Sequence, residues 1–490
     1  LGLFFSWEIM TVSSFFLIAR GKRGSGAALR YILFSLAGAF LIMAGLALTG
    51  GGQFADIMPG IAAGTAVTRS AAILLGIGFI IKMGSAGVHI WLPGAYAETD
   101  DDLSTFFAAV LSKAGLFMLF LTAGLFTMPL MQGASAVFRS VDLSVILGWI
   151  GVITAFLGAF LALFKEDIKY TLAYSSMGQV GYMLLSFALM SQLGWLNSVY
   201  LAVTHLLFKG MLFVAISGVV ARTGTRMMYR MGGLISRMPV SFFTVLIAII
   251  ALSGVPPLTG FGAKWMLYTA LIEKGWYLQA GVAMFASAIA FLYLFRLIHT
   301  IFLGQLKDEF REVREAPVWT LIPQFVGIIG IMLFSMYPNL LLKPIEAAIA
   351  PYFTGDIAWQ GYTVISTLGY WNGNAVMFVT MGVFIVPLVW MLIVQRKHTQ
   401  KVGQFNIVFA AERPHRPETT HYAFNFFAHY RKALGFLYSD TATRFWRWIG
   451  SVAEVTGGSI RKLYSGNLQT YVLLIVLYVS ILLLVLRGGF

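Results

Sequence analysis

Long apolar runs, separated by short polar segments, repeat along almost the whole chain. Twelve of them approach or exceed the roughly 18–20 residues that a helix needs to cross the hydrocarbon core of a bilayer. Runs of this length favour helices over buried strands, which rarely exceed about eight residues. The pattern predicts an all-α polytopic membrane protein with about twelve transmembrane helices. The runs cover residues 4–20, 29–49, 67–91, 103–127, 142–164, 170–190, 195–221, 240–272, 277–303, 318–338, 375–395 and 468–487.

Basic residues are unevenly distributed between these runs. If the runs cross the membrane alternately, 24 of the 34 Lys and Arg residues fall on the side that holds the loop after the first run, and five fall on the other side. Such a surplus marks the cytoplasmic side of membrane proteins. The eleven basic residues of segment 396–465 count for less, because the rule weakens in long loops. The distribution supports both the spans and their orientation.

Composition agrees with a membrane domain and excludes several alternatives. The chain is 59% hydrophobic and 11% charged, whereas soluble domains carry about 25% charged residues. The basic loops account for the net charge of +14 without a nucleic acid as partner. The sequence has no cysteine, which excludes disulfides and thiolate-ligated iron–sulfur or zinc sites in this chain. Any electron chemistry would therefore belong to a partner subunit.

Segment 396–465 differs from the rest of the chain. It is basic and rich in aromatic residues, and its apolar runs are too short to cross a bilayer. This composition predicts an amphipathic segment on the cytoplasmic membrane surface. A disordered tail is the less favoured alternative, because such tails are poor in aromatic residues. Residues 466–490 then form a C-terminal transmembrane helix.

Several ionisable side chains fall at membrane depth, where a charge costs at least about 2.5–3.5 kcal/mol. Lys82 and Lys113 each lie about 14–15 Å from the same membrane face at 1.5 Å per residue, so antiparallel neighbouring helices would bring them to one depth. His205 and Lys209 are four residues apart and share a helix face. The full set is Glu8, Lys82, Lys113, His205, Lys209 and Lys264.

A structural interpretation competes with a functional one for each of these residues. A single buried lysine is often a member of an ion pair, or extends its charge to the membrane surface. Six such groups with lysine in excess favour function, because a desolvated lysine can exchange protons near neutral pH. A carboxylate such as Glu8 could control that exchange by approaching or leaving a lysine.

Two of the predicted spans contain helix-breaking residues beside a lysine. Gly84 and Gly87 follow Lys82, while Pro256 and Pro257 precede Lys264. Proline removes a helix hydrogen bond and glycine lowers the cost of an unwound turn. Interrupted helices at matching positions in two halves mark ion sites in transporters. The second of these spans is the fifth after the first. Because five is an odd number of membrane crossings, consecutive copies of a five-helix repeat would have opposite orientations in the membrane. The alternative interpretation is ordinary proline kinking.

Six segments carry a resemblance to a known family. The chain resembles the antiporter-like subunits shared by respiratory complex I, group 4 membrane-bound hydrogenases and Mrp-type Na+/H+ antiporters. Taken together and in this order, the segments are highly specific and cover about residues 1–300. They read FFSWEIMTVSSFFLI, FIIKMGSAGVHIWLPGAYAE, AVLSKAGLFML, KEDIKYTLAYSSMGQVGYM, THLLFKGMLF and LSGVPPLTGFGAKW.

The resemblance implies roles for individual residues. Glu8 and Lys82 would form the glutamate–lysine pair of the input half-channel. Lys113 and His205, with Lys209 beside them, would continue a central hydrophilic axis. Lys264 would be the terminal residue linked to the outer side. Supporting positions are expected at His89, Arg296 and His299.

The resemblance also implies an organisation into two inverted five-helix repeats with discontinuous helices. The first would cover residues 1–127 and the second 142–303, with additional transmembrane helices in 318–395. The first helix here matches the second helix of the family's first repeat, so the preceding helices are expected to lie outside this sequence. The acidic stretch Asp100–Asp102 is more typical of the hydrogenase and Mrp branches than of complex I.

We therefore expect a proton- or sodium-translocating subunit of a redox-driven complex in the inner membrane of a prokaryotic cell. Its partners would be other membrane subunits and a peripheral redox arm. Iron–sulfur clusters, nickel–iron or flavin would occur only in those partners, and this chain would hold no cofactor or metal. The alternative is a subunit of an Mrp-type antiporter driven by the ion gradient. A structural scaffold without a channel is disfavoured by the intact set of Glu8, Lys82, Lys113 and Lys264.

Overall fold

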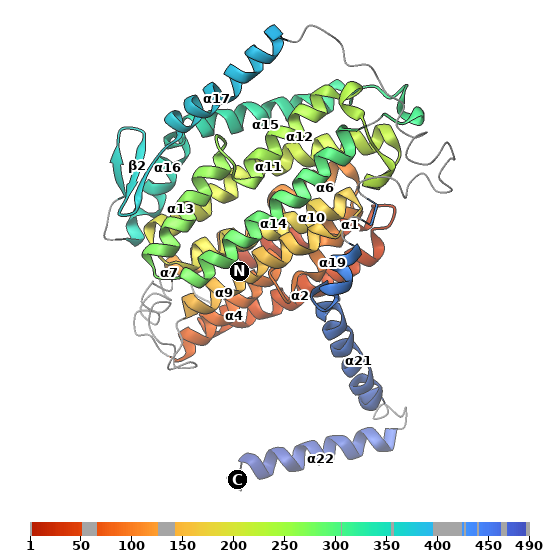
Figure 1. Ribbon diagram of the computed structural model, residues 1–490. Helices are drawn as coiled ribbons and strands as arrows, with labels where there is room; N and C mark the ends of the chain where they lie inside the picture. The colour runs from red at the N-terminus through yellow and green to blue at the C-terminus, as the bar shows by residue number, and fades with distance from the viewer. Residues whose placement is uncertain are drawn as a thin grey trace. The chain divides into compact units, whose positions relative to one another are not determined.

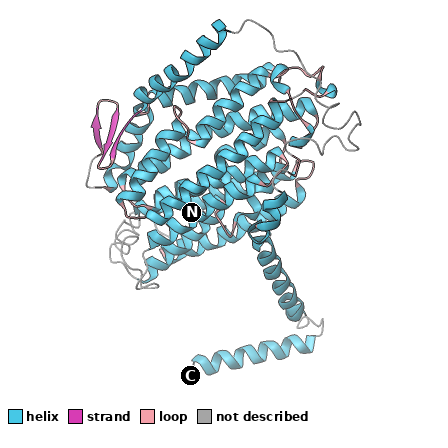
Figure 2. Cartoon of the chain, viewed as in Figure 1, coloured by secondary structure: helices cyan, strands magenta, loops and turns pink. Residues whose placement is uncertain are grey.

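The computed structural model describes residues 2–50, 66–125, 143–304, 306–353, 357–394, 424–425, 428–438, 441–461 and 468–486 (Figure 1). The chain divides into two compact units, Leu1–Ala433 and Leu434–Phe490. In its described residues the first unit is a helical bundle with one small sheet (Figure 2). The described residues of the second unit form helices.

The bounds of the elements are as follows. In the first half of the bundle they are α1 (Gly2–Ala19), α2 (Ser25–Leu48), α4 (Ala66–Met83), η1 (His89–Trp91), α5 (Leu92–Glu98), α6 (Asp101–Phe106), the π turn η2 (Phe107–Leu111) and α7 (Ser112–Leu125). The second half contains α9 (Leu143–Leu163), α10 (Ile168–Ala188), α11 (Gln192–Thr223), η3 (Met228–Arg230), η4 (Leu234–Ser236), α12 (Pro239–Ser253), α13 (Thr259–Glu273) and α14 (Tyr277–Phe302). The remainder comprises η5 (Asp308–Phe310), α15 (Val318–Met336), α16 (Asn339–Ile349), η6 (Ala350–Tyr352), β1 (Ala358–Gln360), β2 (Thr363–Ser366), β3 (Gly369–Asn372), α17 (Gly373–Val394), α19 (Ala428–Ala433), α20 (Gly435–Tyr438), α21 (Thr441–Arg461) and α22 (Leu468–Leu486).

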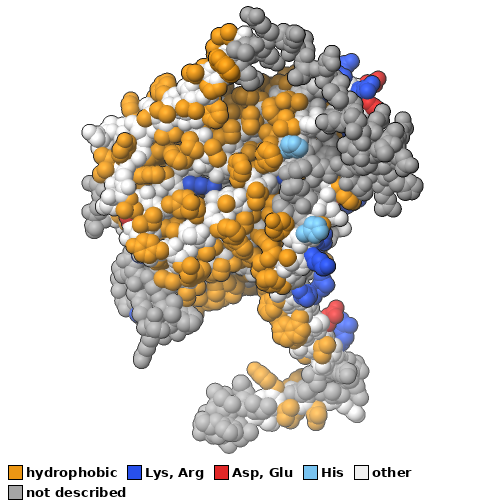
Figure 3. Space-filling view, viewed as in Figure 1, with side chains coloured by type: hydrophobic (Ala, Val, Ile, Leu, Met, Phe, Trp, Pro, Cys, Tyr) orange, Lys and Arg blue, Asp and Glu red, His pale blue; other side chains and the backbone are white. Residues whose placement is uncertain are grey.

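The twelve predicted spans are confirmed as helical. Over its described residues, each apolar run coincides with one helix or with helical segments separated by a short interruption. Within the described residues, seven helices are long and apolar enough to cross a membrane on their own: α1, α2, the continuous segment Asp101–Gly124, α9, α11, α14 and α15. Hydrophobic side chains cover the flank of the bundle seen in Figure 3. The protein is therefore a multi-pass membrane protein.

Polar contacts join the loops that the distribution of basic residues places on one side of the membrane. Arg20 pairs with Asp100 at 3.2 Å, and Lys169 pairs with Asp101 at 2.8 Å. Lys307 donates to the carbonyl of Tyr229 at 3.3 Å. We call this end of the bundle the basic face and the opposite end the outer face. The contacts agree with the predicted orientation, in which the basic face is cytoplasmic.

Close packing of α9 against α10 forms the centre of the bundle. A Cβ atom on Gly151 would lie 2.5 Å from the backbone nitrogen of Leu185. A Cβ atom on Gly158 or Gly181 would likewise overlap the backbone of the facing helix. Small residues at such contacts let two membrane helices approach closely. This contact places α10 in the interior, where nearly all of its residues are buried.

Both predicted helix interruptions are present. α4 ends at Met83, and Gly84 and Gly87 follow with φ values of +72° and +91°. α12 ends at Ser253, and Gly254 has a φ of +74° before α13 begins at Thr259. Side chains with a Cβ atom rarely adopt such φ values. The glycines therefore permit the unwound turns that the sequence predicts beside Lys82 and Lys264.

A three-stranded antiparallel sheet lies at the outer face and was not predicted. Its strand order is β1–β2–β3, and Val364 pairs with Trp371 across β2 and β3. It is fastened to the bundle because the Ser366 and Thr367 hydroxyls donate to Glu273 at the end of α13. Segment 318–395 thus contains this sheet and the short helix α16 as well as the predicted transmembrane helices.

The predicted amphipathic segment 396–465 contains helix α21. Its apolar residues recur at helical spacing, as at Phe445, Trp448, Ile449 and Val452, and none of its residues is buried within the chain. This agrees with an amphipathic surface helix. Its position on the membrane surface stays a prediction, and residues 396–423 lie outside the described part of the chain.

Candidate functional site

Lys82 lies in the last turn of α4 and is only 2% exposed. Its Nζ donates hydrogen bonds to the Tyr31 hydroxyl at 2.7 Å and the Thr11 hydroxyl at 3.0 Å. A third bond reaches the Ser35 hydroxyl at 3.3 Å. The ammonium also lies 4.6 Å from the centroid of the Tyr31 ring. Neutral groups from α1 and α2 thus hold Lys82, and these groups can bind either an ammonium or a neutral amine.

Glu8 lies on α1, three residues before Thr11. The ion pairs within 4 Å among the described residues do not include Glu8 with Lys82, so the predicted pair is not a direct salt bridge here. The two charges still interact through space. One carboxylate oxygen of Glu8 is buried and has no hydrogen-bond partner among the described residues. The structure therefore places Glu8 beside Lys82 without joining them.

Lys113, His205 and Lys209 form a second group in the middle of the bundle. Lys113 follows the π turn, and its Nζ donates to the carbonyl of Ala108 at 2.6 Å. His205 is fully buried, and neither ring nitrogen has a hydrogen-bond partner among the described residues. The charges of Lys113 and Lys209 both act on His205, so the structure brings these three residues together, while their part in ion transfer stays a prediction.

Lys209 is held by α10, a contact that the sequence did not reveal. Its Nζ donates to the Leu172 carbonyl at 3.1 Å and to the hydroxyl of Ser175. Both acceptors lie in the first half of α10. The position of Lys209 therefore depends on how α10 is anchored at the basic face.

Lys264 lies on α13, after the interruption between α12 and α13, and its side chain is half-buried. Its Nζ donates to the carbonyl of Ser253, the last residue of α12, and lies 5.7 Å from the centroid of the Tyr182 ring. A cavity of about 10 Å³ beside it is also lined by Gln179 of α10. This volume is close to the minimum that one water molecule requires. The amine of Lys264 thus contacts groups of α12 and α10 within the bundle.

The three supporting residues are distributed over two elements. His89 is buried in η1, directly after the first interruption. Arg296 is buried on α14 and donates to the Lys165 carbonyl at the end of α9. His299 lies one turn further along α14, with its ring 5.7 Å from that of Phe295. Arg296 and His299 lie close to the basic face, away from the central group.

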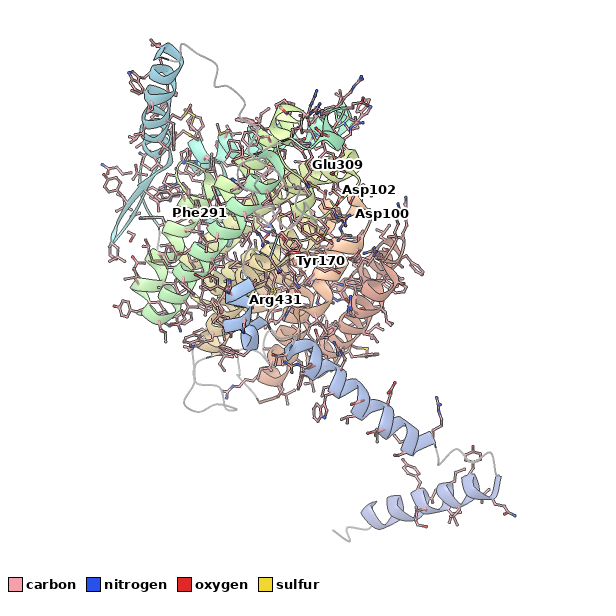
Figure 4. All side chains as sticks on the ribbon, turned by 45° about the vertical axis from the view of Figure 1, so that its right-hand side comes forward. Asp100, Asp102, Tyr170, Phe291, Glu309 and Arg431 are labelled. Carbon is pink, nitrogen blue, oxygen red and sulfur yellow. The ribbon has the colours of Figure 1, made fainter. Side chains whose placement is uncertain are left out.

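A network of charges at the basic face joins the two halves of the bundle. We call Glu98, Asp101, Asp167, Lys169 and Arg226 the charge clamp. Arg226 lies 3.1 Å from Glu98 and 2.9 Å from Asp167, while Lys169 lies 2.8 Å from Asp101. Figure 4 labels Asp100, Asp102 and Tyr170 at this end of the bundle. The clamp fixes the segment that follows the first interruption to the start of α10.

Two members of the charge clamp lie in loops and have shifted pKa values. Burial tends to lower the pKa of Arg226, but the neighbouring Asp167 and Glu98 carboxylates outweigh this effect and raise it. Burial raises the pKa of Asp167, and Arg226 together with the N–H groups of Lys169 and Tyr170 offsets the rise only in part. Arg226 therefore remains charged, whereas protonation of Asp167 is easier than in an exposed aspartate.

The chain matches a family of membrane proteins over more than half its length. The family described as "NADH:quinone oxidoreductase/Mrp antiporter, TM" matches residues 1–290. Among similar curated proteins, NADH-quinone oxidoreductase subunit N of Desulforudis audaxviator is 28% identical, over 70% of this chain and 71% of that protein. One of the Na(+)/H(+) antiporter subunits of Alkalihalophilus pseudofirmus is 27% identical, over 80% of this chain and 52% of that protein.

Solved structures support the same relationship. A chain from the structure of the membrane-bound sulfane sulfur reductase, an archaeal respiratory membrane complex, superposes with a TM-score of 0.84 at 27% identity, over 99% of this chain and 80% of that one. Respiratory complex I from Thermus thermophilus shares the fold with a TM-score of 0.62 at 20% identity, over 72% of this chain and 75% of that one. The resemblance seen in the sequence is confirmed: the chain belongs to the NADH:quinone oxidoreductase/Mrp antiporter transmembrane family.

Proposed function

We propose that this protein translocates protons or sodium ions as the antiporter-like subunit of a redox-driven membrane complex. The observation that carries the proposal is a series of four lysines inside a transmembrane bundle: Lys82 and Lys209 are buried, and Lys113 and Lys264 are half-buried. Buried charges in membrane helices are costly and mark ion pathways. Each of these lysines donates to a hydroxyl or carbonyl oxygen, a contact that can be kept or released as its proton leaves.

The order of the residues gives the proposed path. An ion enters near Glu8 and Lys82 from the basic face. It passes Lys113, His205 and Lys209 in the middle of the bundle and leaves through Lys264 toward the outer face. The unwound turns beside Lys82 and Lys264 free backbone carbonyls within the membrane, and these can bind water or side chains along the path.

The assignment to a redox-driven complex rests on how much of this chain one solved structure matches. The chain from the sulfane sulfur reductase complex matches over 99% of this protein, whereas a chain of the Mrp complex from Dietzia sp. matches over 71% of it. In the proposed assembly, other membrane subunits and a peripheral redox arm surround this chain in a prokaryotic inner membrane. Iron–sulfur, nickel–iron or flavin groups would reside in the arm, since this chain has no cysteine ligands.

The second candidate is a subunit of a gradient-driven antiporter, which the curated Na(+)/H(+) antiporter relatives favour. Purification from the native membrane separates the two. Subunits that carry iron–sulfur, nickel or flavin groups should co-purify, and the reconstituted complex should build an ion gradient when a reductant is added. Ion exchange that needs only an opposing gradient, without redox subunits, would favour the antiporter. A complex that moves no ions under either condition would contradict both.

A further inference from the structure

Trp371 of β3 reaches from the outer sheet into the helical bundle. Its side chain is only 4% exposed, although the neighbouring Tyr370 is 74% exposed. The centroid of its ring lies 6.3 Å from that of Tyr200 on α11 and 6.5 Å from that of Trp265 on α13. A Cβ atom on Gly262 would overlap the indole. The indole is therefore wedged between α11 and α13, and the glycine at 262 makes room for it.

The wedge lies well below the outer face. Tyr200 is eight residues from the first residue of α11, which corresponds to a depth of about 12 Å at 1.5 Å per residue. Glu273 holds the sheet at the outer end of α13 through the hydroxyls of Ser366 and Thr367. In Figure 1 the sheet lies at the same end of the bundle as α16. The sheet thus anchors Trp371 from outside while its ring occupies the gap between the two helices.

The cavity beside Lys264 lies in the same gap. Its lining includes Leu201, the residue after Tyr200, and Ala263, the residue after Gly262. Trp371 therefore contacts Tyr200 and Gly262, and the next residue on each of the two helices lines the cavity.

Two buried polar atoms of α11, one of them on the tyrosine that the indole contacts, have no hydrogen-bond partner among the described residues. The Tyr200 hydroxyl and the Oδ1 atom of Asn197 have none among the described residues, and both side chains are fully buried. Both lie on α11 between the outer face and His205. Buried polar groups are normally hydrogen-bonded, so an unpaired hydroxyl on the tyrosine beside the indole, with a second unpaired group one turn nearer the outer face, points to a passage that admits water when the indole moves.

We propose that Trp371 is the outer gate of the ion path. In the closed state its indole fills the gap between α11 and α13 and separates the Lys264 cavity from the outer face. When β3 withdraws, the gap opens to water, and the Tyr200 and Asn197 polar atoms line the connection to Lys264. The gate rests on the proposed function, because it assigns the outer end of that path; Trp371 acts by position and exchanges no proton.

Thiol labelling tests the gate directly, because the sequence has no native cysteine. Ala263→Cys places a thiol in the cavity lining, and a charged, membrane-impermeant maleimide is added from the outer side of sealed vesicles. The labelling rate follows the fraction of time that the cavity is open, so Trp371→Ala should raise it by about tenfold or more. Trp371→Phe should keep it low. The matched control is Trp359→Ala on β1. The indole of Trp359 donates a hydrogen bond to Glu346 of α16 instead, so this variant should leave the labelling rate unchanged.

Gly262→Ala gives the same test with the tryptophan retained, because the added Cβ would displace the indole. It should also accelerate labelling. If neither variant changes the rate in an assembled complex, or if Trp359→Ala accelerates labelling equally, Trp371 is not a gate.

A leak measurement separates the gate from the proposed function. With an imposed ion gradient and no reductant, Trp371→Ala should raise passive ion flux, and adding Lys264→Ala should remove the increase. A leak that persists in the double variant would show that Trp371 does not close the Lys264 path. Full ion transport by Lys264→Ala alone would refute the exit role of Lys264, whatever the labelling shows.

Discussion

Each lysine at membrane depth donates to neutral oxygen atoms. Lys82 is held by three hydroxyls, Lys113 and Lys264 by backbone carbonyls, and Lys209 by a hydroxyl and a carbonyl. The sequence identified these lysines because charges at that depth are rare. It did not identify Tyr31 or Ser175, since tyrosine and serine are ordinary residues in apolar helices. The ionisable groups were thus predictable, whereas the groups that hold them required the structure.

Glu8 should act on Lys82 through space, because the two form no direct ion pair among the described contacts. Glu8→Gln removes the charge, and an interaction of about 1 kcal/mol corresponds to about a fivefold change in rate. Ion translocation by the reconstituted complex should therefore fall about fivefold or more in Glu8→Gln and less in Glu8→Asp. Equal translocation by Glu8→Gln and the parent protein over a range of pH would reduce Glu8 to a structural role.

The raised pKa of Asp167 has a consequence for stability. The folded protein holds this proton more tightly than the unfolded chain, whose aspartate pKa is about 3.9. The carboxyl group's contribution to stability is therefore complete below about pH 3.9 and is lost as the pH rises through the folded-state pKa. Asp167→Asn removes this dependence and preserves a good N-cap residue for α10.

Thermal unfolding of the purified complex at several pH values measures this contribution. The Tm of the parent protein minus that of Asp167→Asn should decrease as the pH rises above about 4. An increase over the same range would show that the ion pair with Arg226 outweighs the effect of burial.

At the scale of elements, the interruptions were predictable and the outer sheet was not. Glycine and proline beside Lys82 and Lys264 have direct backbone consequences, so the unwound turns could be read from the sequence. The strands have only three or four residues each, which is too short for an alternating pattern to emerge. The charge clamp was missed for a different reason. Its members come from three separate stretches of the sequence, and only the fold brings these stretches together.

The interruption between α12 and α13 should make Lys264 necessary for release of ions to the outer side. The Ser253 carbonyl that it binds belongs to the last residue of α12. Lys264→Ala should abolish net translocation while a partner's redox activity continues in part. Lys264→Glu should retain some translocation, because an acid can also exchange a proton there. The number of ions moved per electron is measured for both variants in proteoliposomes. Full translocation by Lys264→Ala together with none by Lys264→Glu would contradict the role of Lys264 in ion release.

At the scale of the whole molecule, the membrane topology follows from the sequence and the inner path does not. Apolar runs and basic loops predict where helices cross and how they are oriented, since both depend on transfer between water and lipid. The path depends on which helix faces meet inside the bundle. The central position of α10 illustrates this, because its close contact with α9 depends on glycines that could equally have packed elsewhere. The two inverted repeats, 1–127 and 142–303, stay a prediction.

The most direct test of ion translocation is the Lys82→Ala variant of the complete complex in sealed proteoliposomes. Ion uptake and the partner's redox turnover are measured together, and assembly is checked by subunit composition. Removal of the amine takes away the group that Thr11, Tyr31 and Ser35 hold. We predict that an assembled complex loses ion uptake by about tenfold or more, equivalent to at least about 1.4 kcal/mol in the barrier. Ion uptake equal to that of the parent complex, at the same redox turnover, would contradict the proposed path at its first step.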